Sequence, residues 1–277
     1  MQPSLLLCKP LIFISLHQSG GGYGFKKMRC YMRFIIGALF SVFSFLSYAA
    51  NDGGVSLGAT RVVFPSDKNS VVLAVNNSSS SATWLLRAWI SEYGHDVQSS
   101  KKEEPFVITP PLYRLESSDK IQLRINKTQA DKLPVDRESV FYINVLAIPP
   151  ETKIQAEGKD KAESMGGHIQ FAINNRIKLL YRPQDINDQN EIKKALLSLK
   201  ITRQGQEISV DNNSPYYFTL ANIKINGHNL PESVINSTDF MVPPFGHMTF
   251  PAPGARDMVW DTINDYGAFV KGTPLHF

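Results

Sequence analysis

The segment His168–Pro183, which reads HIQFAINNRIKLLYRP, is the most informative part of the chain. Ile169, Phe171 and Ile173 alternate with other residues, which predicts a β-strand with one apolar face. The segment ends at Pro183, which cannot donate a hydrogen bond to a strand ladder. We assign Lys178 to the same alternating face, where a lysine is costly to bury without a partner. That partner could be an internal group or the carboxylate of a ligand.

A period of two recurs through residues 51–277 and predicts an all-β fold. Ile121, Leu123 and Ile125, for example, alternate with polar residues, and turn signals follow at strand-length spacing. Glu191–Leu199 could be read as a helix, but we favour a strand that enters a second domain. Several short strands with regular turns indicate β-sandwich architecture.

The pattern breaks at Arg182–Asp185, where Pro183 interrupts the strand and a polar run follows. We therefore divide the chain into a leader (1–50), an N-terminal domain (51–183) and a C-terminal domain (184–277). The two domains are each near the size of an immunoglobulin-like sandwich.

The leader has the three parts of an export signal. Lys26–Arg33 is rich in basic residues, Phe34–Tyr48 is apolar, and Ala49-Ala50 supplies small residues for cleavage. The apolar run is shorter than the roughly 20 residues of a membrane-spanning helix. We expect cleavage after Ala49 or Ala50 and no stable membrane insertion afterwards; an uncleaved anchor is the alternative.

Charge and cysteine content exclude several classes of function. The chain has 29 Lys and Arg against 25 Asp and Glu, but five of these bases and no acid lie in the first 50 residues. The remainder has a net charge of −1, which argues against a nucleic-acid-binding domain. Cys8 and Cys30 both lie in the leader, so the mature chain has no disulfide, cysteine-based zinc site or cysteine nucleophile.

Motifs for catalysis are missing. No two of the six histidines have i, i+4 spacing, and HExxH, GxSxG, P-loop and GxGxxG motifs do not occur. We expect no enzyme, no metal and no cofactor.

Five blocks in the chain together resemble a known family, the periplasmic chaperones of the chaperone–usher pilus pathway, of the PapD and FimC type. The blocks occur in the family's order and spacing and cover about residues 54–268. They are Gly54–Phe64 (GVSLGATRVVF), Thr109–Leu115 (TPPLYRL), Asp136–Pro150 (DRESVFYINVLAIPP), Asn175–Pro183 (NRIKLLYRP) and Asn264–Ala268 (NDYGA).

The resemblance implies two immunoglobulin-like β-sandwich domains set at an angle, with a cleft between them. It also implies a function in the periplasm of a Gram-negative bacterium. Such a chaperone binds, folds and caps pilus subunits by donor-strand complementation and delivers them to an outer-membrane usher.

The family's functional residues carry over to matching positions in this sequence. Arg61 and Lys178 match the pair that holds the C-terminal carboxylate of a pilus subunit, which would give Lys178 a ligand partner. The matching donor-strand residues are Ile169, Phe171 and Ile173. Three further charged residues match an ion network between the domains, and they are Glu138, Arg182 and Asp265.

The segment Glu151–Gly167 is charged and short, and together with the missing cysteines it resembles the short-loop subgroup that serves rod-like pili. Two other classes remain as alternatives. One is a structural protein, a pilus subunit or adhesive β-sandwich module, although these usually have one incomplete domain and a disulfide. The other is a periplasmic hydrolase on a sandwich fold, for which the sequence offers no motif.

Overall fold

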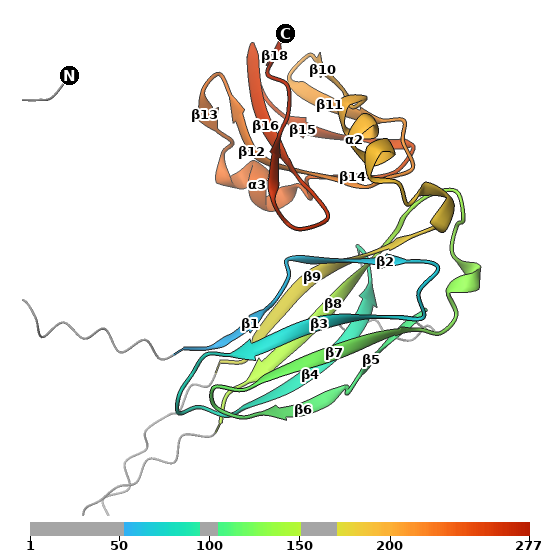
Figure 1. Ribbon diagram of the computed structural model, residues 1–277. Helices are drawn as coiled ribbons and strands as arrows, with labels where there is room; N and C mark the ends of the chain where they lie inside the picture. Colours follow the sequence, from blue (N-terminus) through green and yellow to red (C-terminus); the bar gives the residue numbers. More distant parts are fainter. Residues whose placement is uncertain (1–52, 95–104, 151–170) are drawn as a thin grey trace, which may run out of the picture. The chain divides into compact units, whose positions relative to one another are not determined.

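The computed structural model describes residues 53–94, 105–150 and 171–277, which form two β-sandwiches (Figure 1). Strands β1–β9 build the N-terminal sandwich and strands β10–β18 build the C-terminal one. The predicted two-domain, all-β fold is thereby confirmed. The leader and the segment Glu151–Gly167, with our expectations about them, lie outside the described residues.

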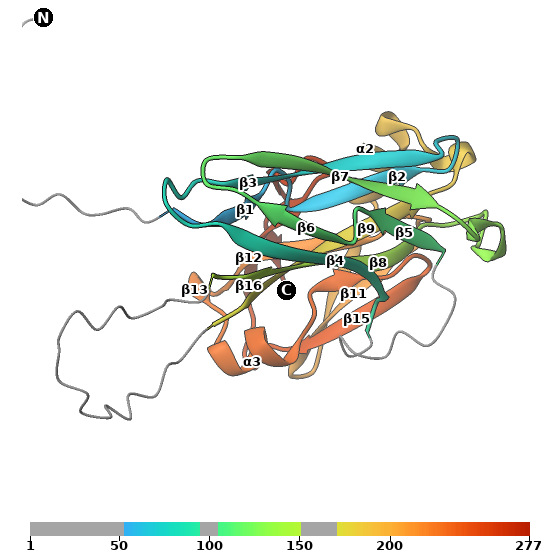
Figure 2. The ribbon, with the colours of Figure 1, turned by 90° about the horizontal axis from the view of Figure 1, so that it is seen from below.

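The N-terminal sandwich consists of a four-stranded and a five-stranded sheet that face each other (Figure 2). The four-stranded sheet has the order β1 (Val55–Leu57), β3 (Ser70–Asn77), β7 (Lys120–Lys127) and β5 (Phe106–Thr109). The five-stranded sheet has the order β2 (Arg61–Pro65), β9 (Ile173–Arg182), β8 (Ser139–Ile148), β4 (Trp84–Glu92) and β6 (Leu112–Leu115). A 3-10 turn, η1 (Ala130–Lys132), follows β7. The strands pair antiparallel except β2 and β9, which run parallel.

Strand alternation builds the core of this sandwich. Leu123 and Ile125 of β7 are buried, as their spacing predicts, and they belong to the same apolar cluster as Leu179 of the facing sheet. Aromatic rings fill the centre: Phe64 and Phe106 have ring centres 5.0 Å apart.

The proline-rich segment Thr109–Leu115 carries the chain from one sheet to the other. β5 ends at Thr109 and pairs with β7, whereas β6 begins at Leu112 and pairs with β4. Pro110 and Pro111 lie between them, where no ladder donor is required.

The C-terminal sandwich begins after a 3-10 turn, η2 (Gln184–Ile186), and a helix, α2 (Gln189–Leu197). One sheet contains β10 (Lys200–Gln204), β11 (Glu207–Asn212) and β15 (Gly246–Pro251). The other contains β13 (His228–Asn229), β12 (Phe218–Ile225), β16 (Asp257–Ile263) and β17 (Phe269–Lys271), with β14 (Met241–Val242) on β12 and β18 (Leu275–His276) on β16. A short helix, α3 (Glu232–Ser237), precedes β14. No helix in the described part of the chain has the length and apolar character to span a membrane.

The strand predicted over Glu191–Leu199 is wrong, because most of this segment lies in α2. The Asp188 side chain caps the helix by accepting hydrogen bonds from the backbone N–H groups of Asn190 and Glu191. Asp188 followed three residues later by Glu191 is a helix-start signature that the sequence analysis missed. Leu196 then packs against the core of the C-terminal sandwich.

Candidate functional site

Two cationic residues lie side by side where β2 pairs with β9. Arg61, the first residue of β2, is the direct partner of Lys178 in the parallel register. Residues paired in this way project from the same face of a sheet. Tyr142 of β8 pairs with Lys178 on its other side. The fold therefore brings together the two residues that the resemblance assigns to carboxylate binding.

The Arg61 guanidinium is buried and incompletely hydrogen-bonded. The residue is only 8% exposed, and its Nη1 donates to the backbone oxygen of Ile263 over 3.0 Å. Its Nε is buried and has no hydrogen-bond partner among the described residues. An unsatisfied buried donor on a cation is costly, and an anion placed beside it would remove that cost.

Lys178 has an internal partner. Its side chain is 18% exposed, and its Nζ lies 3.4 Å from Oδ1 of Asp239, which is about half exposed. We had assigned Lys178 to the face of Ile169, Phe171 and Ile173, and this is wrong. Lys178 and Ile173 are five residues apart on β9, so their side chains project from opposite faces.

Burial disfavours the charges of both cations. It lowers the pKa of Arg61, although Asp265 and Glu138 counteract the shift. It also lowers the pKa of Lys178; Asp239 opposes this effect, while the charge of Arg61 adds to it. Two neighbouring cations in a partly dry environment favour the binding of an anion.

A second charged cluster joins Glu138, Arg182 and Asp265. Arg182 Nε donates to Glu138 over 2.6 Å, and its two terminal nitrogens donate to the two Asp265 oxygens over 2.7 and 2.8 Å. The second Glu138 oxygen accepts from the backbone N–H of Tyr217 over 2.7 Å. The three residues, predicted from different blocks of sequence, thus form one largely buried network, in which Arg182 of β9 joins Glu138, just before β8, to Asp265, in the turn after β16.

A cavity of about 460 Å³ adjoins both clusters. Its lining includes Arg61, Arg182 and Asp265 together with Tyr216 and Thr262, but Lys178 is not part of it. Arg182 and Asp265 in its wall bind each other, and Arg61 Nη1 donates to backbone, whereas the buried Arg61 Nε has no partner among the described residues. Lys193 also lines the cavity.

The expected donor residues are exposed where the structure describes them. Phe171, just before β9, is 76% exposed, and Ile173, the first residue of β9, is 56% exposed. Ile169 lies outside the described residues. β8 pairs with β9 from Ile173 onward, whereas the pairing with β2 begins only at Lys178.

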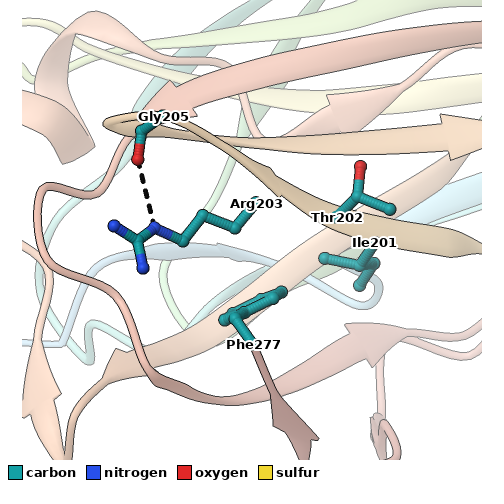
Figure 3. A pocket seen from close by; sticks show the side chains of 5 residues that line it. All are labelled: Ile201, Thr202, Arg203, Gly205 and Phe277. Carbon is teal, nitrogen blue, oxygen red and sulfur yellow. Dashed lines mark hydrogen bonds between the residues drawn. The ribbon is translucent and has the colours of Figure 1, made fainter.

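A different cavity of about 460 Å³ lies on the C-terminal sandwich beside β10 (Figure 3). Its one charged residue, Arg203, donates through Nε to the backbone oxygen of Gly205 over 3.1 Å, close to the Phe277 ring (Figure 3). Its five lining residues include no Asp, Glu, His or Cys and no second Lys or Arg, so it offers no chemistry comparable to the Arg61–Lys178 pair. In the described ranges, no group of His, Cys, Asp and Glu residues could hold a metal ion.

Two residues of the site were missed by the sequence analysis. Asp239 lies between α3 and β14, and Tyr93 follows β4; the Tyr93 hydroxyl donates to Oδ2 of Asp239. Neither residue belongs to a motif or to an informative alternation. Only their packing beside Lys178 identifies them.

Family models match nearly the whole described chain. The model described as "Pili and flagellar-assembly chaperone, PapD N-terminal domain" matches residues 54–187. The model described as "Pili assembly chaperone PapD, C-terminal domain" matches residues 194–274.

Individual proteins show the same similarity. The chain is 38% identical to the chaperone protein FocC of Escherichia coli, over 84% of this chain and 94% of FocC. It is 34% identical to the chaperone protein HifB of Haemophilus influenzae, over 83% of this chain and 90% of HifB. The crystal structure of the periplasmic chaperone SfaE superimposes with a TM-score of 0.61 at 36% identity, covering 80% of this chain and 98% of SfaE. The structure of the Salmonella enterica SafA pilin in complex with the SafB chaperone gives a TM-score of 0.62 at 28% identity, covering 81% of this chain and 96% of the matched chain.

Proposed function

Since the chain belongs to the PapD family of pilus-assembly chaperones of the chaperone–usher pathway, we propose that it captures pilus subunits by donor-strand complementation and delivers them to an outer-membrane usher. The family is a class of assembly chaperones and not of enzymes. The observation that carries the proposal is the pairing of two largely buried cations, Arg61 and Lys178, on adjacent strands, with the buried Nε of Arg61 unpaired among the described residues.

The cation pair is proposed to hold the C-terminal carboxylate of the subunit. Arg61 Nε would gain the hydrogen bond that it lacks, and Lys178 would form a charge-assisted bond to the same group. Because both side chains come from adjacent strands, their spacing is fixed by the sheet and requires no ordering of loops.

The segment that leads into β9 is proposed to be the donor strand. Phe171 and Ile173, with Ile169 before them, would place apolar side chains into the incomplete sandwich of the subunit. Burying each exposed side chain contributes roughly 1.5–3 kcal/mol. The anchored carboxylate would set the register, and a slip by one residue would turn all donor side chains to the wrong face.

The network of Glu138, Arg182 and Asp265 is proposed to fix the geometry of the two domains without touching the subunit. Its buried and bidentate hydrogen bonds support a positional role. We place the division between the domains at residues 183 and 184, after the last strand of the N-terminal sandwich. We also place the mature protein in the periplasm, after removal of the leader 1–50, because the similar chaperone SfaE is periplasmic.

The test is co-purification from the periplasm of cells that express the tagged chaperone with a pilus subunit of the same organism. We expect the parent protein to retain the subunit and both Lys178→Met and Arg61→Met to lose it. Lys224→Met, which removes an exposed lysine from β12 of the C-terminal sandwich, is the matched control and should retain the subunit. Retention of the subunit by both Lys178→Met and Arg61→Met at the parent level would refute the carboxylate anchor.

A further inference from the structure

Asp239 holds the ammonium of Lys178 in the free protein. The carboxylate of Asp239 lies 3.4 Å from Lys178 Nζ through Oδ1, and its other oxygen accepts a hydrogen bond from the Tyr93 hydroxyl. Each oxygen of this carboxylate therefore has one donor. A subunit carboxylate bound at the cation pair would form its hydrogen bond with the same lysine, Lys178.

Packing fixes the positions of these groups. The ring of Tyr93 lies 5.3 Å from that of Tyr142, and Lys178 Nζ lies 5.9 Å from the Tyr93 ring centre. The position of Asp239 is fixed by Met241, which follows it by two residues and is buried in a cluster with Val140 and Leu180. The contact thus comes from two packed elements and not from a chance approach of long side chains.

The two members of the pair differ in exposure. Asp239 is 48% exposed and Lys178 only 18%. A half-exposed carboxylate returns to water at little cost, whereas a largely buried ammonium left alone would be destabilised. An incoming carboxylate can therefore replace Asp239 without leaving either group unsatisfied.

We infer that Asp239 is an internal competitor that occupies Lys178 in the free chaperone and that the C-terminal carboxylate of a subunit must displace. This inference rests on the proposed function of Lys178. Asp239 keeps the lysine paired until a ligand arrives, and it disfavours anions that bring no further contacts. When only a fraction of the chaperone molecules have Lys178 available, the apparent affinity for the ligand falls in proportion to that fraction.

The test uses a synthetic peptide with the C-terminal sequence of a pilus subunit, as the free acid and as the amide. Asp239→Asn keeps the side-chain shape and removes the charge, so we expect it to bind the free acid about five- to tenfold more tightly. Binding of the amide should not change. Glu232→Gln, the same charge change at an exposed position of α3, is the control and should match the parent.

A second measurement requires no ligand. Lys178 is followed by NMR after isotopic dimethylation of the lysines, with Lys178→Met used for assignment. Because Asp239 opposes the effect of burial on the pKa of Lys178, the pKa should fall further in Asp239→Asn.

The outcomes separate the two proposals. If the pKa of Lys178 is unchanged in Asp239→Asn, Asp239 is not an internal competitor. The same holds if Asp239→Asn binds the free acid with unchanged affinity while Lys178→Met abolishes binding. Either result leaves the proposed function standing. Parent-level binding by Lys178→Met refutes the proposed function, and the competitor falls with it. Tighter binding of the free acid alone, together with the lower pKa, supports the inference.

Discussion

Arg61 and Lys178, two cationic residues, are direct partners in the parallel pairing of β2 and β9. In the part of the chain that the structure describes, the buried Nε of Arg61 has no partner, and Lys178 is paired with a half-exposed carboxylate. Two cations on adjacent strands would ordinarily repel each other. Their pairing on one sheet face, with the Nε donor of Arg61 unpaired among the described residues, is the arrangement expected of an anion-binding site.

A positive charge alone should not replace Arg61 in binding the subunit carboxylate. Arg61→Lys keeps the positive charge but has no group equivalent to both Nε and the Nη1 that donates to Ile263. We expect this variant to bind a free-acid subunit peptide about tenfold more weakly than the parent. Fluorescence anisotropy with labelled peptide measures the change, and parent-level affinity would contradict the role of the guanidinium geometry.

The exposed residues before and at the start of β9 should matter for binding and not for folding. Phe171→Ser combined with Ile173→Ser should change the free energy of unfolding by less than about 0.5 kcal/mol, because both side chains are largely exposed. The same variant should fail to retain a subunit in co-purification. Val107→Ser, an exposed apolar residue of β5, should change neither property. A subunit complex that survives the double substitution would exclude this segment as the donor.

Removal of Arg182 should destabilise the fold strongly. Arg182→Met leaves the carboxylate of Glu138 buried and without its cation, so we expect a loss of about 3–5 kcal/mol in the free energy of unfolding. Urea denaturation at pH 7 measures the loss. The double variant Arg182→Met with Glu138→Leu should recover part of it, since no charge is then buried alone. A loss below about 1 kcal/mol in the single variant would show that the network contributes little.

Asp265 should make the stability depend on acid pH. Burial alone would raise its pKa, but the hydrogen bonds and charge of Arg182 outweigh burial and lower it. The folded pKa then lies below the unfolded value of about 3.9. The ionised carboxylate therefore stabilises the folded state above that value, and the contribution is lost as the pH falls through the folded pKa.

Asp265→Asn provides the comparison for this pH effect. The difference in the free energy of unfolding between the parent and Asp265→Asn should be constant near neutral pH and should shrink below about pH 4. Urea denaturation over a series of pH values measures it. A difference that persists unchanged at pH 3 would assign the stabilisation to hydrogen bonds that do not depend on the charge of Asp265.

Local sequence determined much of the fold. The alternation at Ile121, Leu123 and Ile125 predicted a strand with one buried face, because successive side chains of a strand point to opposite sides. The block Thr109–Leu115 was selected by its resemblance to the family, and the structure shows that the chain crosses between the two sheets there. The helix α2 was also encoded locally, by Asp188 and Glu191, but the apolar residues around Leu196 were read with the wrong period.

The site was only partly accessible from sequence. Resemblance between blocks selected Arg61, Lys178 and the three residues of the buried network, but no local pattern states that Arg61 pairs with Lys178. That pairing follows from the parallel register of two strands from distant parts of the N-terminal domain. Tertiary packing alone determines three further features of the site. These are the contact of Asp239 with Lys178, the hydrogen bond from the Tyr93 hydroxyl, and the unsatisfied Nε of Arg61. Local periodicity determines which face of a strand is buried, whereas the partner of each charge depends on which distant side chains the folded chain places within reach.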